Sequence, residues 1–295
     1  MQLTISNLVK TYPNGVQALR GIDLVIPQGM FGLLGPNGAG KSSLMRTIAT
    51  LQEADGGSIF LDDMDVLKEK AAVRKILGYL PQEFGVYPKI SPELMLDHIA
   101  RLKGIDNAKE RKQVVGALLE RVNLYTDRKK NLGTFSGGMK QRFGIAQALM
   151  GNPKLIIVDE PTAGLDPAER NRFYNLLSEL GENTIVILST HIVEDVRTLC
   201  SDFAIICQGE LLRHDHPDEA VQSLEGSIYS KAISKASIEE YRNNYQVISV
   251  QMKGGNLTIR IYAETDPGNG FIPQAAELED VYFHQIAGKM NVITL

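Results

Sequence analysis

A run of glycines that ends in a lysine and a serine constrains the fold of this chain more than any other feature. Eight consecutive residues match the pattern of a phosphate-binding P-loop at every fixed position: Gly35, Pro36, Asn37, Gly38, Ala39, Gly40, Lys41 and Ser42. An apolar stretch at residues 31–34 precedes them, and a helical pattern begins at Lys41. A strand, a glycine turn and a helix in that order present backbone N–H groups and a helix N-terminus to an anion. The sequence therefore predicts a phosphate cradle between a strand and a helix.

The side chains at the end of this loop have separate predicted roles. Lys41 adds a point charge directed toward the β- and γ-phosphates of a nucleotide, and Ser42 offers a hydroxyl to Mg²⁺. We count the next residue, Ser43, among the nucleotide-binding residues as well. A glycine-rich turn without a ligand is the alternative, but the flanking strand and helix favour the cradle.

A second motif places two carboxylates at the end of an apolar strand. Residues 155–158 are all apolar and lead directly to Asp159 and Glu160. In open α/β sheets, ligands bind at the carboxyl ends of the strands. Neighbouring residues of a strand face opposite ways, so we expect the two carboxylates to have different tasks. We assign Asp159 to the Mg²⁺ shell and Glu160 to polarising the water that attacks the γ-phosphate; a solvated loop start is the alternative.

The order of the predicted elements indicates an α/β fold with a mainly parallel sheet. The apolar runs at residues 155–158 and 185–188 are typical of strands buried on both faces, and an amphipathic helix at 167–180 lies between them. Short strands near the N-terminus, at residues 3–5 and 24–26, predict a β-rich first part.

The remaining regions differ in character from this core. Residues of about 85–150 show helical periodicity, which predicts a helical insertion within a nucleotide-binding domain that spans 1–215. Residues 216–295 are predicted to form a small α+β accessory domain, because two alternating segments flank a turn at 253–256.

Composition excludes several classes of protein. Lys and Arg total 31 against 35 Asp and Glu, so the net charge is −4, and we expect no nucleic-acid partner. Two cysteines, Cys200 and Cys207, make no disulfide scaffold. The sequence has no apolar run of the length that spans a bilayer and no signal-peptide pattern at Met1. We therefore expect a soluble, cytoplasmic chain that reaches any membrane process through a partner.

A third motif narrows the class of nucleotide-binding protein. Ser136, Gly137 and Gly138 start a helical pattern, so the serine can cap a helix whose N-terminus is a second anion site. Here the sequence resembles the ATP-binding cassette (ABC) family, whose usual signature is Leu-Ser-Gly-Gly-Gln. This chain has Phe135 and Met139 at the first and last positions. The methionine variant is similar to that of the drug- and antibiotic-export subgroup.

The resemblance adds further site residues, which occur in the family's order. It implies that Tyr12 stacks on adenine, that Gln82 is the Q-loop glutamine near the metal and the reaction, and that His191 is the switch histidine. Residues 163–166 match the D-loop, which adds Asp166 to the nucleotide-binding residues. The resemblance extends strongly to about residue 213. It is weaker in the tail, where residues 278–282 match the subgroup's closing motif or simply form a helix that packs on the small sheet.

The resemblance implies a mechanism and partners. ATP and Mg²⁺ are the expected ligands, and two copies are expected to hold ATP between the P-loop of one and the signature of the other. By the family pattern, a separate transmembrane permease subunit of an exporter would hold the chain at the inner face of the cell membrane. We expect residues 83–88, with Phe84, Val86 and Tyr87 exposed, to contact it.

Other interpretations stay open from the sequence alone. They are a non-transport ABC ATPase in translation or DNA repair, an importer subunit, and a module that binds ATP without turnover. A zinc site at His214 and His216 and a metal site in the acidic turn at residues 62–65 are less favoured than structural roles.

Overall fold

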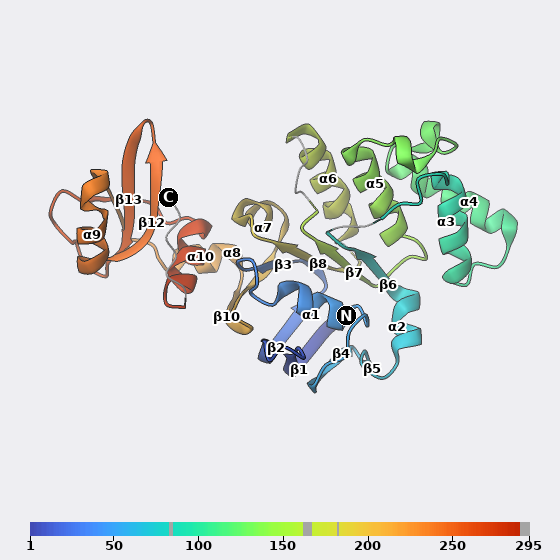
Figure 1. The fold of residues 1–295 in the computed structure, drawn as a ribbon, viewed down its shortest axis with the longest axis horizontal. Coiled ribbons are helices and arrows are strands. Elements are labelled where there is room, and N and C mark those ends of the chain that lie inside the picture. Colours follow the sequence, from blue (N-terminus) through green and yellow to red (C-terminus); the bar gives the residue numbers. More distant parts are fainter. Residues whose placement is uncertain (83–84, 162–166, 182, 290–295) are drawn as a thin grey trace.

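Three β-sheets and the helices around them make up the part of the chain that the computed structural model describes, residues 1–82, 85–161, 167–181 and 183–289 (Figure 1). The first sheet is antiparallel and has the strand order β2-β1-β4-β5. Its strands are β1 (Gln2–Thr11), β2 (Gln17–Pro27), β4 (Gly56–Leu61) and β5 (Met64–Asp65). The β-rich first part that the sequence predicts is therefore confirmed.

The central sheet is mainly parallel and carries the predicted phosphate-binding segments. Its strand order is β10-β9-β3-β8-β7-β6, and only β10 pairs antiparallel. The strands are β3 (Gly29–Leu34), β6 (Leu77–Leu80), β7 (Leu155–Asp159), β8 (Ile185–Thr190), β9 (Asp202–Cys207) and β10 (Glu210–Asp215). The predicted α/β fold with a mainly parallel sheet is confirmed, with β10 as its antiparallel edge.

Both faces of this sheet are covered, which explains its uninterrupted apolar strands. On one face, Leu155 and Ile157 of β7 pack with the first sheet and with α1 (Lys41–Ile48). On the other face, Ile156 and Val158 pack with helices that include α6 (Pro167–Leu180) and α7 (Val193–Leu199). Figure 1 shows these two layers on opposite sides of the sheet. The alternation along β7 follows the two-residue period of a strand.

The stretch from residue 90 to 150, all of which the structure describes, contains helices and no strand. The helices are α3 (Pro92–Leu102), α4 (Ala108–Arg121) and α5 (Gly137–Ala148); α2 (Lys70–Ile76) precedes them. Side chains cap their N-termini: Ser91 accepts a hydrogen bond from the α3 backbone, and Asn107 from that of α4. The predicted helical insertion is therefore present in the fold, and Figure 1 places α3 and α4 at one end of the molecule.

The C-terminal region forms its own small sheet, with the order β12-β13-β11-β14. Its elements are α8 (Pro217–Gln222), β11 (Ile228–Ala232), α9 (Ile238–Asn244), β12 (Gln246–Lys253), β13 (Asn256–Tyr262), β14 (Ile272–Pro273) and α10 (Leu278–Ala287). The predicted hairpin is the β12–β13 pair. A small α+β unit thus follows β10, at the opposite end from α3 and α4 (Figure 1).

Helix α10 covers residues 278–282, for which one interpretation of the sequence is a helix that packs on the small sheet. The helix packs on that sheet and on other elements as well. It contacts β12, but it also contacts α7, α8 and the strands β9 and β10. Leu278, Val281 and Tyr282 belong to the same buried cluster as Val196 of α7 and Phe203 of β9. The helix therefore joins the C-terminal unit to the central sheet through apolar packing.

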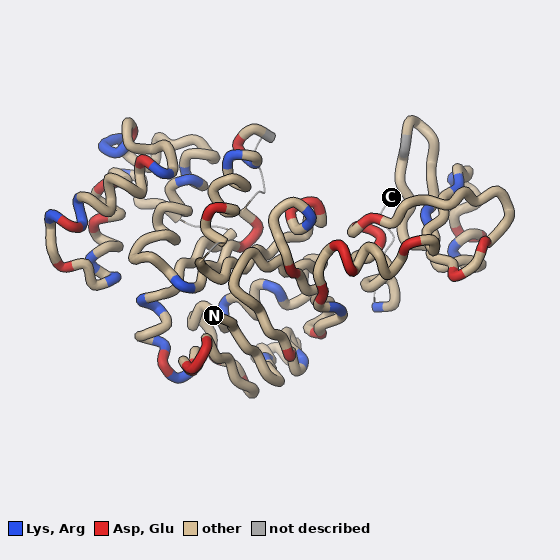
Figure 2. Tube along the Cα trace, turned by 180° about the vertical axis from the view of Figure 1, so that it is seen from behind, with Lys and Arg blue, Asp and Glu red and all other residues tan. Residues whose placement is uncertain are grey.

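Charged residues of both signs are interspersed along the helices of the described chain (Figure 2). Among the described residues, no helix combines the length and the apolar character needed to cross a bilayer.

Candidate nucleotide-binding site

The predicted P-loop connects β3 to α1, and two of its glycines are required by close backbone contacts. A Cβ atom on Gly35 would lie 2.3 Å from the carbonyl oxygen of Ile206, and one on Gly40 would lie 2.4 Å from that of Ala18. Gly40 also has a φ of 110°, which side chains disfavour. The loop is therefore held tightly against β2 and β9.

The turn between β9 and β10 fixes the loop from outside. The Gly209 N–H donates to the carbonyl oxygen of Ala39 at 2.8 Å, and the Gly209 carbonyl accepts from the Arg20 N–H at 2.8 Å. This turn thus links the P-loop to β2. Local sequence gives no signal for this contact, because Gly209 lies far along the chain from Ala39.

Lys41 lies buried beneath the loop. Its Nζ donates to the carbonyl oxygens of Gly35 at 2.6 Å and Pro36 at 3.1 Å, and it lies 4.0 Å from Oε1 of Glu160. Burial lowers the pKa of Lys41, and the neighbouring carboxylates Glu160 and Asp159 oppose that shift. A desolvated cation whose hydrogen bonds go to neutral carbonyls fits an anionic ligand such as a nucleotide phosphate.

Asp159 and Ser42 supply oxygen atoms of the kind that Mg²⁺ prefers. Asp159 ends β7 and is buried, and burial raises its pKa, while hydrogen bonding from the Ser42 side chain acts in the opposite direction. A divalent cation fits this pair because it would offset the cost of burying the carboxylate. The described residues contain no cluster of three or more His, Cys, Asp or Glu side chains that could hold a metal ion.

Glu160 is the centre of a converging set of side chains. Its Oε2 accepts from Gln82 Nε2 at 3.0 Å and lies 3.3 Å from Nδ1 of His191, while Oε1 faces Lys41. Its backbone is left-handed, with a φ of 45°, and its N–H donates to the carbonyl oxygen of Ser189 at 2.9 Å. The structure thus brings together Lys41, Gln82, Glu160 and His191, the four predicted catalytic residues.

Lys41, Gln82 and Glu160 border a cleft of about 640 Å³. From the predicted set, it is lined by Tyr12, Asn37, Gly38, Ala39, Gly40, Lys41, Ser42, Ser43, Gln82 and Glu160. Five further lining residues were not predicted: Val16, Gln17, Ala18, Arg20 and Gln208. They come from β2, the turn before it and the β9–β10 turn, and no local motif marks them.

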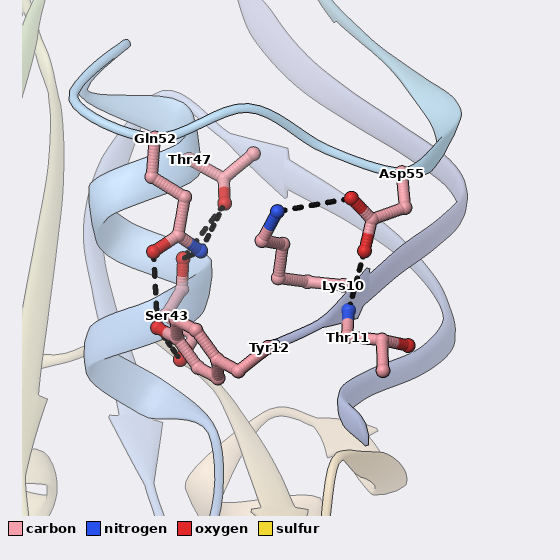
Figure 3. Close-up of polar contacts among 7 residues, drawn as sticks. All are labelled: Lys10, Thr11, Tyr12, Ser43, Thr47, Gln52 and Asp55. Carbon is pink, nitrogen blue, oxygen red and sulfur yellow. Dashed lines mark hydrogen bonds and ion pairs between the residues drawn. The ribbon is translucent and has the colours of Figure 1, made fainter. Parts of the chain in front are cut away.

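Tyr12 lies at the edge of the cleft, where β1 ends. Its hydroxyl is 2.9 Å from Oγ of Ser43 and 3.0 Å from Oε1 of Gln52, so the side chain is anchored to α1 and the segment after it (Figure 3). The ring is half-buried. The sequence predicted an aromatic platform here but not this anchoring of its hydroxyl.

The predicted signature lies elsewhere. Ser136 caps α5 and accepts from the Met139 N–H at 3.2 Å, as predicted. Ser136 and Gly137 are not among the described residues that line the cleft. A Cβ atom on Gly137 would meet no described atom within 4 Å. Asp166 and the rest of the predicted D-loop lie outside the described residues.

Polar contacts hold the ends of β7 and β8. Gln141 of α5 donates to the carbonyl oxygen of Pro161, directly after Glu160, at 2.6 Å. On the other side, Thr190 precedes His191; its hydroxyl donates to Asp195 at 2.9 Å and accepts from the Ile192 N–H at 2.9 Å.

Asp195 extends this second contact to α6. It is fully buried, and one of its oxygens accepts from the hydroxyl of Tyr174. Burial and the hydrogen bond to Asp195 raise the pKa of Tyr174, so the hydroxyl remains a donor. This network fixes the backbone on both sides of His191. The sequence did not predict it, because its members lie on three different elements.

Because of this network, a change at Thr190 is expected to lower turnover and to leave ATP affinity unchanged. Thr190→Val keeps the side-chain volume but removes both hydroxyl contacts beside His191, so we expect kcat to fall about tenfold, as loss of roughly 1.4 kcal/mol of positioning would give. Thr190→Ser retains the hydroxyl and should restore the rate. Phosphate release and ATP titration measure the two effects.

A double variant separates positioning from general stability. If Thr190 acts through His191, adding Thr190→Val to His191→Ala should lower kcat no further. A second independent drop in kcat would contradict the positioning role.

The histidines, acidic residues and cysteines outside the predicted site have structural contacts. His214 pairs with Asp202 at 3.1 Å, and Nδ1 of His216 lies 2.7 Å from the Ser201 carbonyl oxygen. Asp65, the last residue of β5, pairs with Lys68 at 2.8 Å. Cys200 and Cys207 are free and buried, and burial raises the pKa of both thiols.

The parallel sheet, the P-loop and the carboxylates at the end of β7 define a P-loop nucleotide-binding domain. The sequence model of the family described as "ABC transporter" matches residues 19–163. The linearmycin resistance ATP-binding protein LnrL of Bacillus subtilis is 37% identical over 212 residues, which cover 71% of this chain and 68% of LnrL. The chain belongs to the ABC transporter family of ATP-binding proteins.

Two further comparisons agree with this assignment. YbhF of Escherichia coli, named a probable multidrug ABC transporter ATP-binding protein, is 35% identical over 227 residues, or 76% of this chain. The chain spans only 39% of the length of YbhF. A dimeric structure of the ATP-binding cassette MJ0796, in a post-hydrolysis state with ADP and Pi, matches with a TM-score of 0.67 and 26% identity; the match covers 72% of this chain and 98% of that one.

Proposed function

We propose that this chain binds and hydrolyses ATP as a subunit of an ABC exporter, and that two copies close around ATP to drive a separate transmembrane subunit. One observation supports the chemistry most: Lys41, Gln82 and His191 converge on Glu160 beside a phosphate-binding loop. A module that only holds ATP has no need of a carboxylate in this position.

The predicted site residues have distinct roles in this proposal, and Tyr12 stacks on the base of ATP. The loop N–H groups and Lys41 bind the β- and γ-phosphates, and Ser42, Asp159 and Gln82 hold Mg²⁺. Bound Mg²⁺ would neutralise charge that develops on the phosphates. Glu160 accepts a proton from the attacking water, and His191 orients that carboxylate through the same oxygen that Gln82 contacts.

Dimerisation accounts for the position of the signature. Ser136 and Gly137 form a helix N-terminus outside the cleft, which suits a phosphate held by another chain. A twofold axis would place the signature of each copy over the cleft of the other and create two composite sites. The dimeric arrangement of the MJ0796 cassette supports this proposal.

Export is favoured over import by the relatives. YbhF is named for multidrug transport and LnrL for linearmycin resistance, and both names fit outward movement of a toxic compound. In this proposal the chain lies at the cytoplasmic face of the membrane, bound to its permease. An importer subunit is the second candidate within the same class.

The division of the chain at residue 215 also remains a proposal. We infer that residues 216–295 form an accessory domain that acts on dimer contact or regulation. Support comes from α10, which packs on α7 close to the loop of His191. A cavity of about 270 Å³ lies between that loop and the first two turns of α10.

The permease is proposed to bind an apolar groove on α3. The groove has a volume of about 550 Å³ and is rich in apolar side chains, among them Tyr87, Ile90, Leu94, Met95, Ile99 and Leu102. Tyr87, Leu94 and Leu102 are 62%, 60% and 72% exposed. An amphipathic helix from the permease fits such a groove. Of the predicted contact segment, Tyr87 is exposed as expected, whereas Val86 is half-buried against the core, and Phe84 lies outside the described residues.

A charge in this groove is expected to release the chain from its membrane partner. Leu94→Asp should remove most of the chain that sediments with native membranes, because a carboxylate cannot enter an apolar interface without a partner. ATP affinity of the purified variant should stay within about twofold of wild type. Val25→Asp, at an exposed apolar position on β2, is the matched control. Equal loss from membranes in both variants, or in neither, would contradict the assignment of the groove.

A further inference from the structure

The segment between α1 and β4 holds the end of β1 with two side chains. Asp55 accepts from Nζ of Lys10 at 2.9 Å and from the backbone N–H of Thr11 at 2.5 Å. Gln52 reaches the next residue, Tyr12, at its hydroxyl (Figure 3). The last two residues of β1, Lys10 and Thr11, and the next residue, Tyr12, are therefore bonded to this one segment.

The chemistry of the partners fixes the direction of the hydrogen bonds around Gln52. The Ser43 carbonyl oxygen can only accept, so the Gln52 amide nitrogen must face it, at 3.3 Å; the same nitrogen lies 3.1 Å from Oγ1 of Thr47. The Gln52 carbonyl oxygen then faces Tyr12, whose hydroxyl must donate to it at 3.0 Å. The Ser43 hydroxyl, 2.9 Å away, therefore donates to the Tyr12 oxygen.

This direction makes the two contacts to Tyr12 unequal. Ser43 has one hydroxyl proton, so it cannot donate to Tyr12 and to a phosphate oxygen at the same time. Gln52 has no such second partner, because its amide faces α1 and Tyr12 and not a phosphate. When Ser43 turns its proton to a phosphate, Gln52 remains the acceptor that fixes the Tyr12 hydroxyl.

We propose that Gln52 is a positioning residue that holds Tyr12 as a preformed platform for the base, and thereby favours a triphosphate that carries a base over a bare one. The inference rests on the proposed function, in which Tyr12 contacts the base. A platform that is already fixed loses less side-chain freedom when a ring stacks on it. The phosphate contacts of the P-loop do not depend on Tyr12, so Gln52 acts on the base alone.

The test compares two ligands, MgATP and inorganic tripolyphosphate with Mg²⁺, on the full chain by calorimetric titration. The measured quantity is the ratio of their affinities. Gln52→Met keeps the length of the side chain and removes the amide, and should lower the ratio about fivefold, the factor that one neutral hydrogen bond contributes. Tyr12→Phe should do the same, and the double variant should show no further drop.

Two matched variants separate this role from general support of α1. Gln52→Glu still accepts from the Tyr12 hydroxyl but cannot donate to the Ser43 carbonyl, so the ratio should stay near that of wild type. Glu53→Gln changes an exposed neighbour that pairs with Lys70 and should leave the ratio unchanged.

Each other outcome overturns the inference. If Gln52→Met weakens both ligands equally, Gln52 supports α1 and does not position Tyr12. If Tyr12→Ala lowers the ratio and Gln52→Met does not, the platform stands and the role of Gln52 is wrong. If Tyr12→Ala leaves the ratio unchanged, the base contact in the proposed function fails, and this inference fails with it.

Discussion

Replacing Glu160 by glutamine is expected to lower ATP hydrolysis by roughly 10²–10⁴-fold, the usual contribution of a positioned general base. The change removes the basic oxygen but keeps the side-chain shape between Gln82 and His191. Mg²⁺ and ATP binding should remain, because Asp159, Ser42 and Lys41 are untouched.

Phosphate release and nucleotide titration measure these two effects on the same preparation. Glu194→Gln, the same chemical change at an exposed position on α7, is the matched control and should leave both unchanged. A Glu160→Gln chain that hydrolyses ATP at the rate of wild type would show that another group activates the water.

Removing Lys41 is expected to weaken ATP binding and to stop turnover. The buried ammonium group can exchange its two carbonyl partners for phosphate oxygens, and charge-assisted contacts of this kind contribute about 2–3 kcal/mol, or roughly 30- to 150-fold in affinity. The loss also removes a buried cation that interacts with Glu160 and Asp159. We therefore expect no measurable hydrolysis from Lys41→Ala.

Two further variants make this result interpretable. Lys41→Met keeps the buried apolar stem and should preserve the fold better while giving the same loss of ATP affinity. Lys68→Ala removes an exposed lysine and should change nothing. Wild-type hydrolysis by a folded Lys41→Ala chain would contradict the assignment of the P-loop.

Sequence patterns predicted the parts of the fold that local chemistry decides. The run at residues 155–158 is apolar because β7 is buried on both faces, and the glycines at 35 and 40 are needed where the backbone meets Ile206 and Ala18. The hairpin of β12 and β13 follows from its turn and alternation. Each of these signals lies within a few residues of the structure that it predicts.

Contacts between distant segments could not be predicted in this way. Nothing near Gln208 or Gly209 indicates that their turn meets Ala39, and nothing near Tyr174 indicates that it reaches Asp195. The gathering of Gln82 and His191 at Glu160 came from resemblance to a family, since neither residue has a local pattern. The anchoring of Tyr12 by Gln52 depends on how the chain returns after α1, which only the folded structure gives.

In the proposed dimer, ATP is held between the cleft of one chain and the signature of another. Gly137→Asp tests the role of the signature, because the added side chain meets no described atom in its own chain but would face a phosphate in the dimer. It would therefore repel ATP held by the partner without disturbing the fold.

Sedimentation velocity of chains that all carry Glu160→Gln tests this shared site. With ATP, the chain that carries Glu160→Gln alone should form dimers, and with ADP it should not. Adding Lys41→Ala or Gly137→Asp should keep each chain monomeric alone. An equal mixture of these two double variants should dimerise, because it contains one intact cleft facing one intact signature. A mixture that stays monomeric at saturating ATP, while the Glu160→Gln chain dimerises, would contradict the shared site.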